Sequence, residues 1–174
     1  MDKKTLKIIG VIVAVATSFP LHFLYDKFPN FLTSIFSPVN ESIWEHMKIL
    51  FGSIMFSGVV QKIIILLRKE KVNNICLSNF IAALSSIPIF LILFLPVYHM
   101  IGENFPMTII IMIEAIAIAE LVSYILMNKE NFKLENKTIF FVIGVYIIFT
   151  ILTYYPIRGS LFMDSTSSKY GIIK

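Results

Sequence analysis

Apolar residues gather into five runs that are separated by short polar segments. Each run holds about 18 to 25 residues, which is long enough for a helix to cross the roughly 30 Å hydrocarbon core of a bilayer. The runs lie at about 8–25, 43–67, 75–98, 107–127 and 138–155. This pattern predicts an all-α fold, a polytopic transmembrane helical bundle of five spans, in which residues 1–174 form a single transmembrane domain.

Composition supports this interpretation. Of the 174 residues, 57% are hydrophobic and 15% are charged, and the mean hydropathy of +0.81 is too high for an ordinary soluble domain. We therefore expect a multi-pass protein of the cell membrane, with the lipid bilayer as its main partner. The net charge of +4 does not indicate nucleic-acid binding, because the basic residues cluster between apolar runs and form no basic stripe.

The distribution of lysine and arginine predicts an orientation. The N-terminus, the turn 68–71 and the loop 128–137 would share one side and carry most of the basic residues of the short loops. By the positive-inside rule this side is cytoplasmic. Five spans then place the C-terminus outside, together with the tail 156–174. The triplet Ala14-Val15-Ala16 leaves a signal peptide open as an alternative, although an uncleaved first span is favoured.

The segment Ser37 to Lys48, with the sequence SPVNESIWEHMK, concentrates acids, an amide, a histidine and the single tryptophan. Ser37-Pro38 interrupts the preceding structure, and Ser42 with Glu45 three residues later predicts a capping box at the start of a helix. A polar flank on such a helix is costly against hydrocarbon, so we expect it to face the bundle.

The predicted topology brings several acid-base side chains to the outer side. Five of them are candidate catalytic residues: His22, Glu41, Glu45, His46 and Asp164. His99 and Glu103 fall on the same side. A carboxylate beside a histidine supports general acid-base catalysis, and two histidines with carboxylates can hold a divalent metal as a cofactor. Their topology alone does not establish contact.

Other polar residues are candidates for a substrate or ion pathway: Asn40, Trp44, Lys48, Glu120 and Ser123. Glu114, Glu120 and Lys62 lie within apolar runs, where a charge costs several kcal/mol unless it is paired or protonated. We expect a cavity that opens outward between the second and fourth spans, with Glu120 at its floor and the tail near its mouth. These residues also have purely structural interpretations. Trp44 would lie at the membrane interface, Lys48 would extend its ammonium group to the membrane surface, and Glu120 would form a hydrogen bond between helices.

Several kinds of chemistry are excluded. Cys76 is the only cysteine, so the chain forms no internal disulfide and no cysteine-based metal site. The chain contains no phosphate-binding glycine loop, no nucleophile elbow and no HExxH motif. No internal repeat is present, so an inverted-repeat transporter would require a dimer.

The motif SPVNESIWEHMK, with PLHFLY at 20–25, ELVSY at 120–124 and LFMD at 161–164, resembles an uncharacterised family of small polytopic bacterial membrane proteins. The resemblance implies membrane location and no activity. Residues 40–46 are more weakly similar to the start of a span in the progestin/adiponectin receptor and hemolysin III superfamily. That superfamily has seven spans and a late histidine pair for zinc, whereas this chain has no histidine after His99.

Three hypotheses for function remain open. The first is a membrane-embedded enzyme that acts on a lipid or lipid-linked group at the outer face. The second is a small transporter or channel component that uses Glu114 and Glu120. The third is a non-catalytic assembly or sensing subunit, either a homo-oligomer or a protein with a membrane partner.

Overall fold

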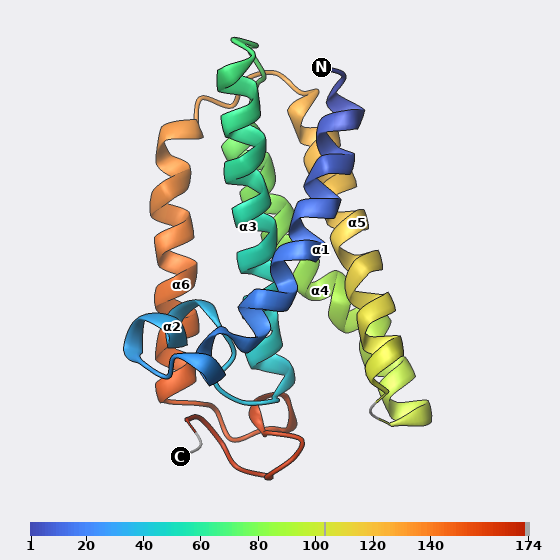
Figure 1. Cartoon of the computed structure of the whole chain (residues 1–174), viewed down its shortest axis with the longest axis vertical. Helices are drawn as coiled ribbons and strands as arrows, with labels where there is room; N and C mark the ends of the chain where they lie inside the picture. Colours follow the sequence, from blue (N-terminus) through green and yellow to red (C-terminus); the bar gives the residue numbers. More distant parts are fainter. Residues whose placement is uncertain (103, 173–174) are drawn as a thin grey trace.

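The computed structural model describes residues 1–102 and 104–172. Five long helices run along the length of the molecule (Figure 1): α1 (Lys3–Lys27), α3 (Ile43–Leu67), α4 (Ile75–Ile101), α5 (Phe105–Met127) and α6 (Thr138–Tyr154). Each of these helices, the last extended back to Glu135, is long and apolar enough to cross a membrane. The prediction of an all-helical bundle with five such helices is confirmed. The N- and C-termini lie at opposite ends of the bundle.

Three short helices complete the secondary structure: α2 (Phe31–Phe36), the 3-10 helix η1 (Glu135–Lys137) and the 3-10 helix η2 (Ser160–Phe162). Sequence analysis treated the segment before Ser37 as a connection and missed α2. Its N-cap is Asn30, whose side chain accepts a hydrogen bond from the backbone N–H of Thr33, while the Thr33 hydroxyl accepts one from the Asn30 N–H. This capping box is the sequence signal for the short helix.

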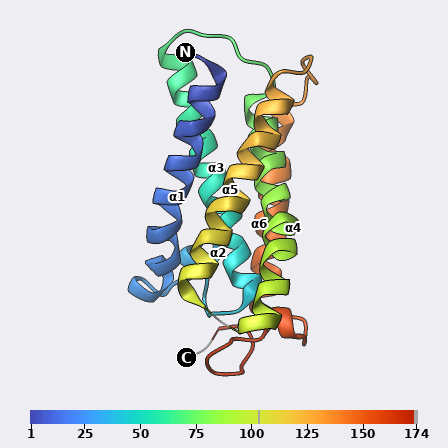
Figure 2. The same ribbon diagram turned by 90° about the vertical axis from the view of Figure 1, so that its right-hand side faces the viewer.

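The helices pack in two main pairs, α1 against α3 and α4 against α5, and α5 crosses between α1 and α4 (Figure 2). Alanines fill the tightest positions of the core: Ala14, Ala82, Ala83, Ala115 and Ala119 are fully buried. Small side chains let the helix backbones approach closely, which is the usual source of helix association in bilayers. Phe51, Phe80 and Phe149 fill the wider spaces between the helices.

Large apolar side chains cover the outside of the long helices. Examples from all five are Ile12, Ile63, Ile92, Ile118 and Phe140, each about half exposed or more. Such a surface is unfavourable in water and typical of helices that face hydrocarbon. Helix α6 is the least covered and packs mainly on α2 and α4.

Candidate functional site

The segment that precedes α3 is fastened to α1 by Ser37. Its buried hydroxyl donates a hydrogen bond to the carbonyl oxygen of Leu21 (2.6 Å) and accepts one from the backbone N–H of Tyr25 (3.1 Å). The Ser37 hydroxyl therefore bridges two backbone groups of α1, within one turn of His22. This contact sets the position of the segment 37–42 relative to His22.

The start of α3 differs in detail from the predicted capping box. The Ser42 hydroxyl accepts a hydrogen bond from the Glu45 N–H (3.3 Å), as predicted. The Glu45 carboxylate, however, accepts from the N–H of Val39 (3.0 Å) and does not close the box on Ser42. The Ser42 N–H instead donates to the side-chain oxygen of Asn40 (2.9 Å), so only half of the predicted box forms.

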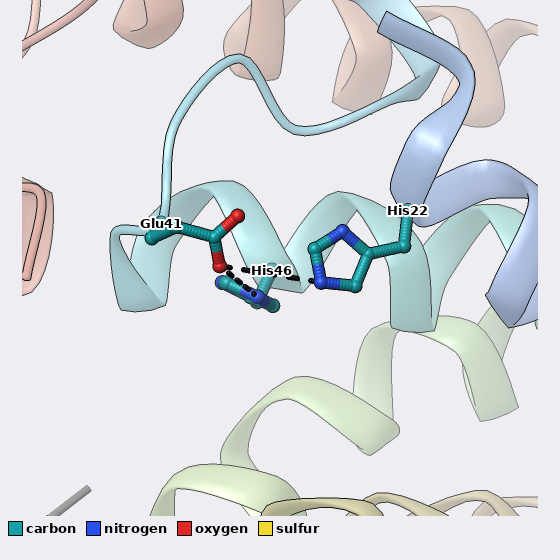
Figure 3. Close-up of side chains that lie close together, drawn as sticks. All are labelled: His22, Glu41 and His46. Atoms are coloured by element: carbon teal, nitrogen blue, oxygen red, sulfur yellow. Dashed lines mark ion pairs between the residues drawn. The ribbon is translucent and has the colours of Figure 1, made fainter. Parts of the chain in front are cut away.

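His22, Glu41 and His46 come together at this end of the bundle (Figure 3). The His46 Nε2 atom lies 3.4 Å from the Glu41 Oε2 atom, and the His22 Nε2 atom lies 4.0 Å from the same oxygen. One ligating atom from each residue lies within 4.8 Å of the others. Helix α1 supplies His22, the turn before α3 supplies Glu41, and the first turn of α3 supplies His46.

Hydrogen bonding orients the His46 ring. Its Nδ1 atom lies 2.9 Å from the carbonyl oxygen of Ser42, which can only accept, so Nδ1 carries the proton. In the absence of a metal, a protonated Nε2 donates to Glu41, and loss of this proton leaves a neutral ring whose Nε2 lone pair faces Glu41 and His22. A backbone carbonyl on the far nitrogen is the usual support of a histidine that binds a metal.

The spacing of the three side chains suits a divalent metal. Around a tetrahedral zinc ion with bonds of about 2.0–2.2 Å, ligand atoms stand about 3.3 Å apart. The His46 and Glu41 atoms, 3.4 Å apart, already have this separation. The whole set extends to 4.8 Å, so His22 has to approach the other two by about 1–1.5 Å. Among the described residues, the buried Nδ1 atom of His22 has no hydrogen-bond partner, so the protein alone does not satisfy this ring.

Glu41 is ionised in this setting. The hydrogen bond from His46 lowers the pKa of the Glu41 carboxyl, and the nearby histidine charges add to this effect against partial burial. The side chain is 39% exposed, so water also reaches it. A carboxylate whose ionised form is favoured, beside two imidazoles, is an electrostatically favourable place for a cation.

The tail after α6 holds the backbone on either side of Glu41. Asp164 Oδ2 accepts a hydrogen bond from the Glu41 N–H (2.7 Å), and the Asn40 side chain donates one to the carbonyl oxygen of Gly171 (2.7 Å). Asp164 Oδ1 accepts from the N–H groups of Thr166 and Ser167. Burial alone would raise the pKa of Asp164, but these hydrogen bonds outweigh it and lower the pKa.

Asp164 and Asn40 therefore act on the backbone around Glu41 and do not join the His22–Glu41–His46 group. A carboxylate that already accepts so many hydrogen bonds is a weak base. The expectation that the tail lies near the site agrees with these contacts. A catalytic role for Asp164 finds no geometric support.

Three other candidates point away from the histidines. The Glu45 Oε2 atom pairs with the Lys48 Nζ atom at 2.5 Å, and Glu45 Oε1 accepts a hydrogen bond from the Thr153 hydroxyl of α6 (2.7 Å). The Trp44 ring packs between Phe162 and Phe149, with centroid distances of 4.8 and 5.4 Å. The polar flank of α3 does face the bundle, as expected, but Glu45, Lys48 and Trp44 bind α6 and the tail.

Two cavities border the His22–Glu41–His46 group. The first, of about 110 Å³, lies between α1, α3 and α5 and is lined mainly by apolar side chains, including Phe19, Phe105 and Met112. The second, of about 180 Å³, lies between α3, α4 and the tail, and its lining is more polar. Glu41, His46 and Thr108 line both cavities.

Glu120 does not form the floor of these cavities, and Ser123 lies with it elsewhere. Neither residue lines the two cavities. Both contact the ammonium group of Lys7, which sequence analysis regarded only as a basic residue flanking the first span. Gln61 and Asn79, which complete this group, were also missed. Their polarity within apolar runs was the available signal, because buried polar side chains must find partners.

The remaining acid-base residues fall into three situations. His99 lines the second cavity together with His46. Glu114 is exposed on α5 and lines neither cavity. Glu103 lies outside the described residues.

Comparison with known proteins places the chain in a family. A family model described as a family of unknown function (DUF6512) matches residues 1–172, so the chain belongs to this family. No curated protein and no solved structure matches the chain. The family description names no activity, and the residues of the site are therefore the guide to chemistry.

Proposed function

We propose that this protein is a multi-pass cell-membrane enzyme in which His22, Glu41 and His46 bind a divalent metal, zinc by preference, and hydrolyse a lipid or lipid-linked substrate. The observation that carries the proposal is the convergence of the three ligating atoms within 4.8 Å, with the far nitrogen of His46 held by a backbone carbonyl. Two histidines and one glutamate are a ligand set of catalytic zinc sites, which keep a fourth position for water.

The chemistry follows from that ligand set. A metal held by three protein ligands lowers the pKa of a bound water toward neutrality and polarises a carbonyl or phosphoryl oxygen of the substrate. Glu41, His22 and His46 would hold the ion, and the Ser42 carbonyl would keep the His46 ring in the ligating tautomer. His99, on the wall of the second cavity, is the candidate proton donor to the leaving group.

The two cavities indicate the kind of substrate. An acyl or isoprenoid chain suits the apolar cavity beside Phe19, Phe105 and Met112, and a polar headgroup suits the cavity beside His99 and the tail. The bond to be cleaved would then lie at Glu41 and His46, which line both. Such a substrate is amphipathic and enters from the bilayer.

Orientation is part of the proposal. The end of the bundle opposite the site carries the N-terminus and the basic connections, and the positive-inside rule makes that end cytoplasmic. The site would then face outward.

The transporter alternative has less support. It draws on Glu114 and Glu120, but neither lines the cavities at the His22–Glu41–His46 group. Glu120 is neutralised by Lys7, with 3.0 Å between Glu120 Oε2 and Lys7 Nζ. The third hypothesis, an assembly subunit, predicts that a partner protein co-purifies with the chain. The purification for metal analysis would detect such a partner.

Metal analysis tests the proposal directly. Purified protein in lipid nanodiscs is incubated with zinc, freed of excess metal and analysed by inductively coupled plasma mass spectrometry. We expect about one ion per chain, and loss of at least 90% of it in His46→Ala and Glu41→Gln. His99→Ala is the matched control, because His99 lines the cavity without joining the ligand set. Equal metal content in all four proteins would overturn the metal centre.

Lipid turnover tests the reaction. The protein is incubated with a total bacterial lipid extract, and products are followed by mass spectrometry. We expect a zinc-dependent product with a free acyl or isoprenoid chain, absent with Glu41→Gln. Stoichiometric zinc without turnover of any lipid would leave a metal site and reject the hydrolase.

A further inference from the structure

The ammonium group of Lys7 sits in a cage of four oxygen atoms. Its Nζ atom lies 2.6 Å from Ser123 Oγ, 2.7 Å from Gln61 Oε1, 2.8 Å from Asn79 Oδ1 and 3.0 Å from Glu120 Oε2. All five residues are buried. The group lies nearer the other end of the bundle, away from the His22–Glu41–His46 group.

The oxygens come from helices that do not include Lys7. Gln61 belongs to α3, Asn79 to α4, and Glu120 and Ser123 to α5, whereas Lys7 belongs to α1. Hydrogen bonds within this group already hold the oxygens in place. The Gln61 amide donates to Glu120 Oε1 (3.1 Å), and the Ser123 hydroxyl lies 3.1 Å from Asn79 Oδ1. Helices α3, α4 and α5 thus form the cage, and α1 inserts the charge.

The number of oxygens exceeds what hydrogen bonding to lysine requires. An ammonium group on a side chain has three N–H donors, but four oxygens lie within 3.0 Å of Nζ. Four oxygen atoms around one positive charge resemble the ligand shell of a cation site. In such a site the attraction between the oxygens and the cation matters more than the direction of individual N–H groups. Among the described residues, Glu120 Oε2 has no hydrogen-bond partner and relies on Lys7.

A second observation points to access for a free ligand. A cavity of about 290 Å³ between α1 and α5 is lined by Lys7 and Glu120, and its other walls are Lys4, Tyr124 and four apolar residues of the two helices. Removal of the Lys7 side chain would connect this cavity with the four oxygens. A small cation could then reach the cage without separation of the helices.

We infer that α3, α4 and α5 form a binding site for an ammonium-type monovalent cation, and that Lys7 occupies it as a tethered ligand. The site thereby docks α1, the helix that carries His22 at its other end. The inference is independent of the proposed hydrolase, because it concerns different residues and needs no metal.

An ordinary buried ion pair makes a different prediction. If Lys7 and Glu120 only neutralise each other, Glu120 takes up a proton when Lys7 is removed. The unfolding temperature of Lys7→Ala would then not depend on which cation is present. A cation site instead binds an added cation in place of the missing ammonium group. Binding to the folded state then raises the unfolding temperature in proportion to the logarithm of the cation concentration.

The experiment is thermal unfolding of Lys7→Ala in detergent, in ammonium chloride or in N-methylglucamine chloride of equal ionic strength and pH. We expect ammonium to raise the unfolding temperature of the variant by about 4 °C at roughly ten times its Kd. Wild type and Lys27→Ala, which lacks an exposed lysine at the other end of the same helix, should not respond selectively. The double variant Lys7→Ala/Glu120→Gln should lose most of the response.

Equal unfolding temperatures of Lys7→Ala in the two salts would overturn the inference, as would an equal response of Lys27→Ala. If Lys7→Ala does not fold in N-methylglucamine chloride, recovery of monodisperse protein is measured in both salts. Recovery only in ammonium chloride supports the site, and aggregation in both salts rejects it.

Discussion

Lys48 and Glu45 form an ion pair that is completely enclosed by α3, α2 and α6. Lys48 Nζ also donates hydrogen bonds to the Ser34 carbonyl (2.8 Å) and the Thr153 hydroxyl (3.0 Å). The charges thus join the start of α3 to α2 and α6, which otherwise packs loosely on the bundle.

Removal of one partner should be much more harmful than removal of both. Glu45→Gln leaves the Lys48 charge buried without its counterion, a loss of about 3–5 kcal/mol in the free energy of unfolding. Glu45→Gln combined with Lys48→Met should cost less than the sum of the two single changes. Denaturant unfolding in mixed micelles measures all three, with exposed Lys129→Met as the control. Additive effects would contradict the pairing.

Gly10 permits α1 to approach the Lys7 cage. A Cβ atom at this position would lie 2.2 Å from Gln61 Nε2 and 2.8 Å from Glu120 Oε1, so these side chains would have to move. We expect Gly10→Ala to lower the free energy of unfolding by about 1–3 kcal/mol. Gly144→Ala in α6 meets no atom within 4 Å and should stabilise its helix by up to about 1 kcal/mol. Thermal unfolding measures both changes in stability, which should have opposite signs. Unchanged stability of Gly10→Ala would contradict the close approach of α1 to Gln61 and Glu120.

Asp164 should keep the tail docked in mild acid. Its pKa lies below the ordinary value of 3.8. The stabilisation is therefore complete above that value and is lost as the pH falls through the lowered pKa of the folded state. At pH 4 the amide of Ser167 should still be protected from hydrogen exchange. Asp164→Asn should reduce this protection about tenfold at pH 4 and at pH 7, whereas exposed Asp26→Asn should not. Loss of wild-type protection already above pH 4 would contradict the assignment.

Ser37 should influence the proposed metal site at His22, Glu41 and His46 without touching it. Ser37→Ala removes the hydroxyl between Leu21 and Tyr25, and the segment that carries Glu41 loses its fixed position beside His22. We expect zinc affinity to fall about 10- to 100-fold, the usual effect of residues that support ligands. Ser85→Ala is the control, since its hydroxyl only bonds within α4. Competition with a fluorescent chelator measures both, and unchanged affinity of Ser37→Ala would argue against this role.

The sequence predicted the long helices well because length and hydropathy are local properties. It also pointed to His22, Glu41 and His46, because topology restricts them to one end. The sequence could not predict the partners of Glu45 and Glu120, because Thr153 and Lys7 lie far from them in the chain. Lys7 was hidden because a lysine near a helix end is usually a topology signal. Lys7 points into the bundle because of how α1 is rotated about its own axis, and hydropathy does not determine that rotation.

The contacts of the tail have a consequence for biosynthesis. Asp164 accepts a hydrogen bond from the backbone N–H of Glu41, and the Gly171 carbonyl accepts one from the side chain of Asn40. The segment before α3 is synthesised early, but it obtains these partners only when the tail has been synthesised. While the ribosome is still synthesising α6, His22 and His46 can already be in the bilayer, but Glu41 lacks its final support. The His22–Glu41–His46 group therefore reaches its final geometry only after α6 and the tail have been synthesised.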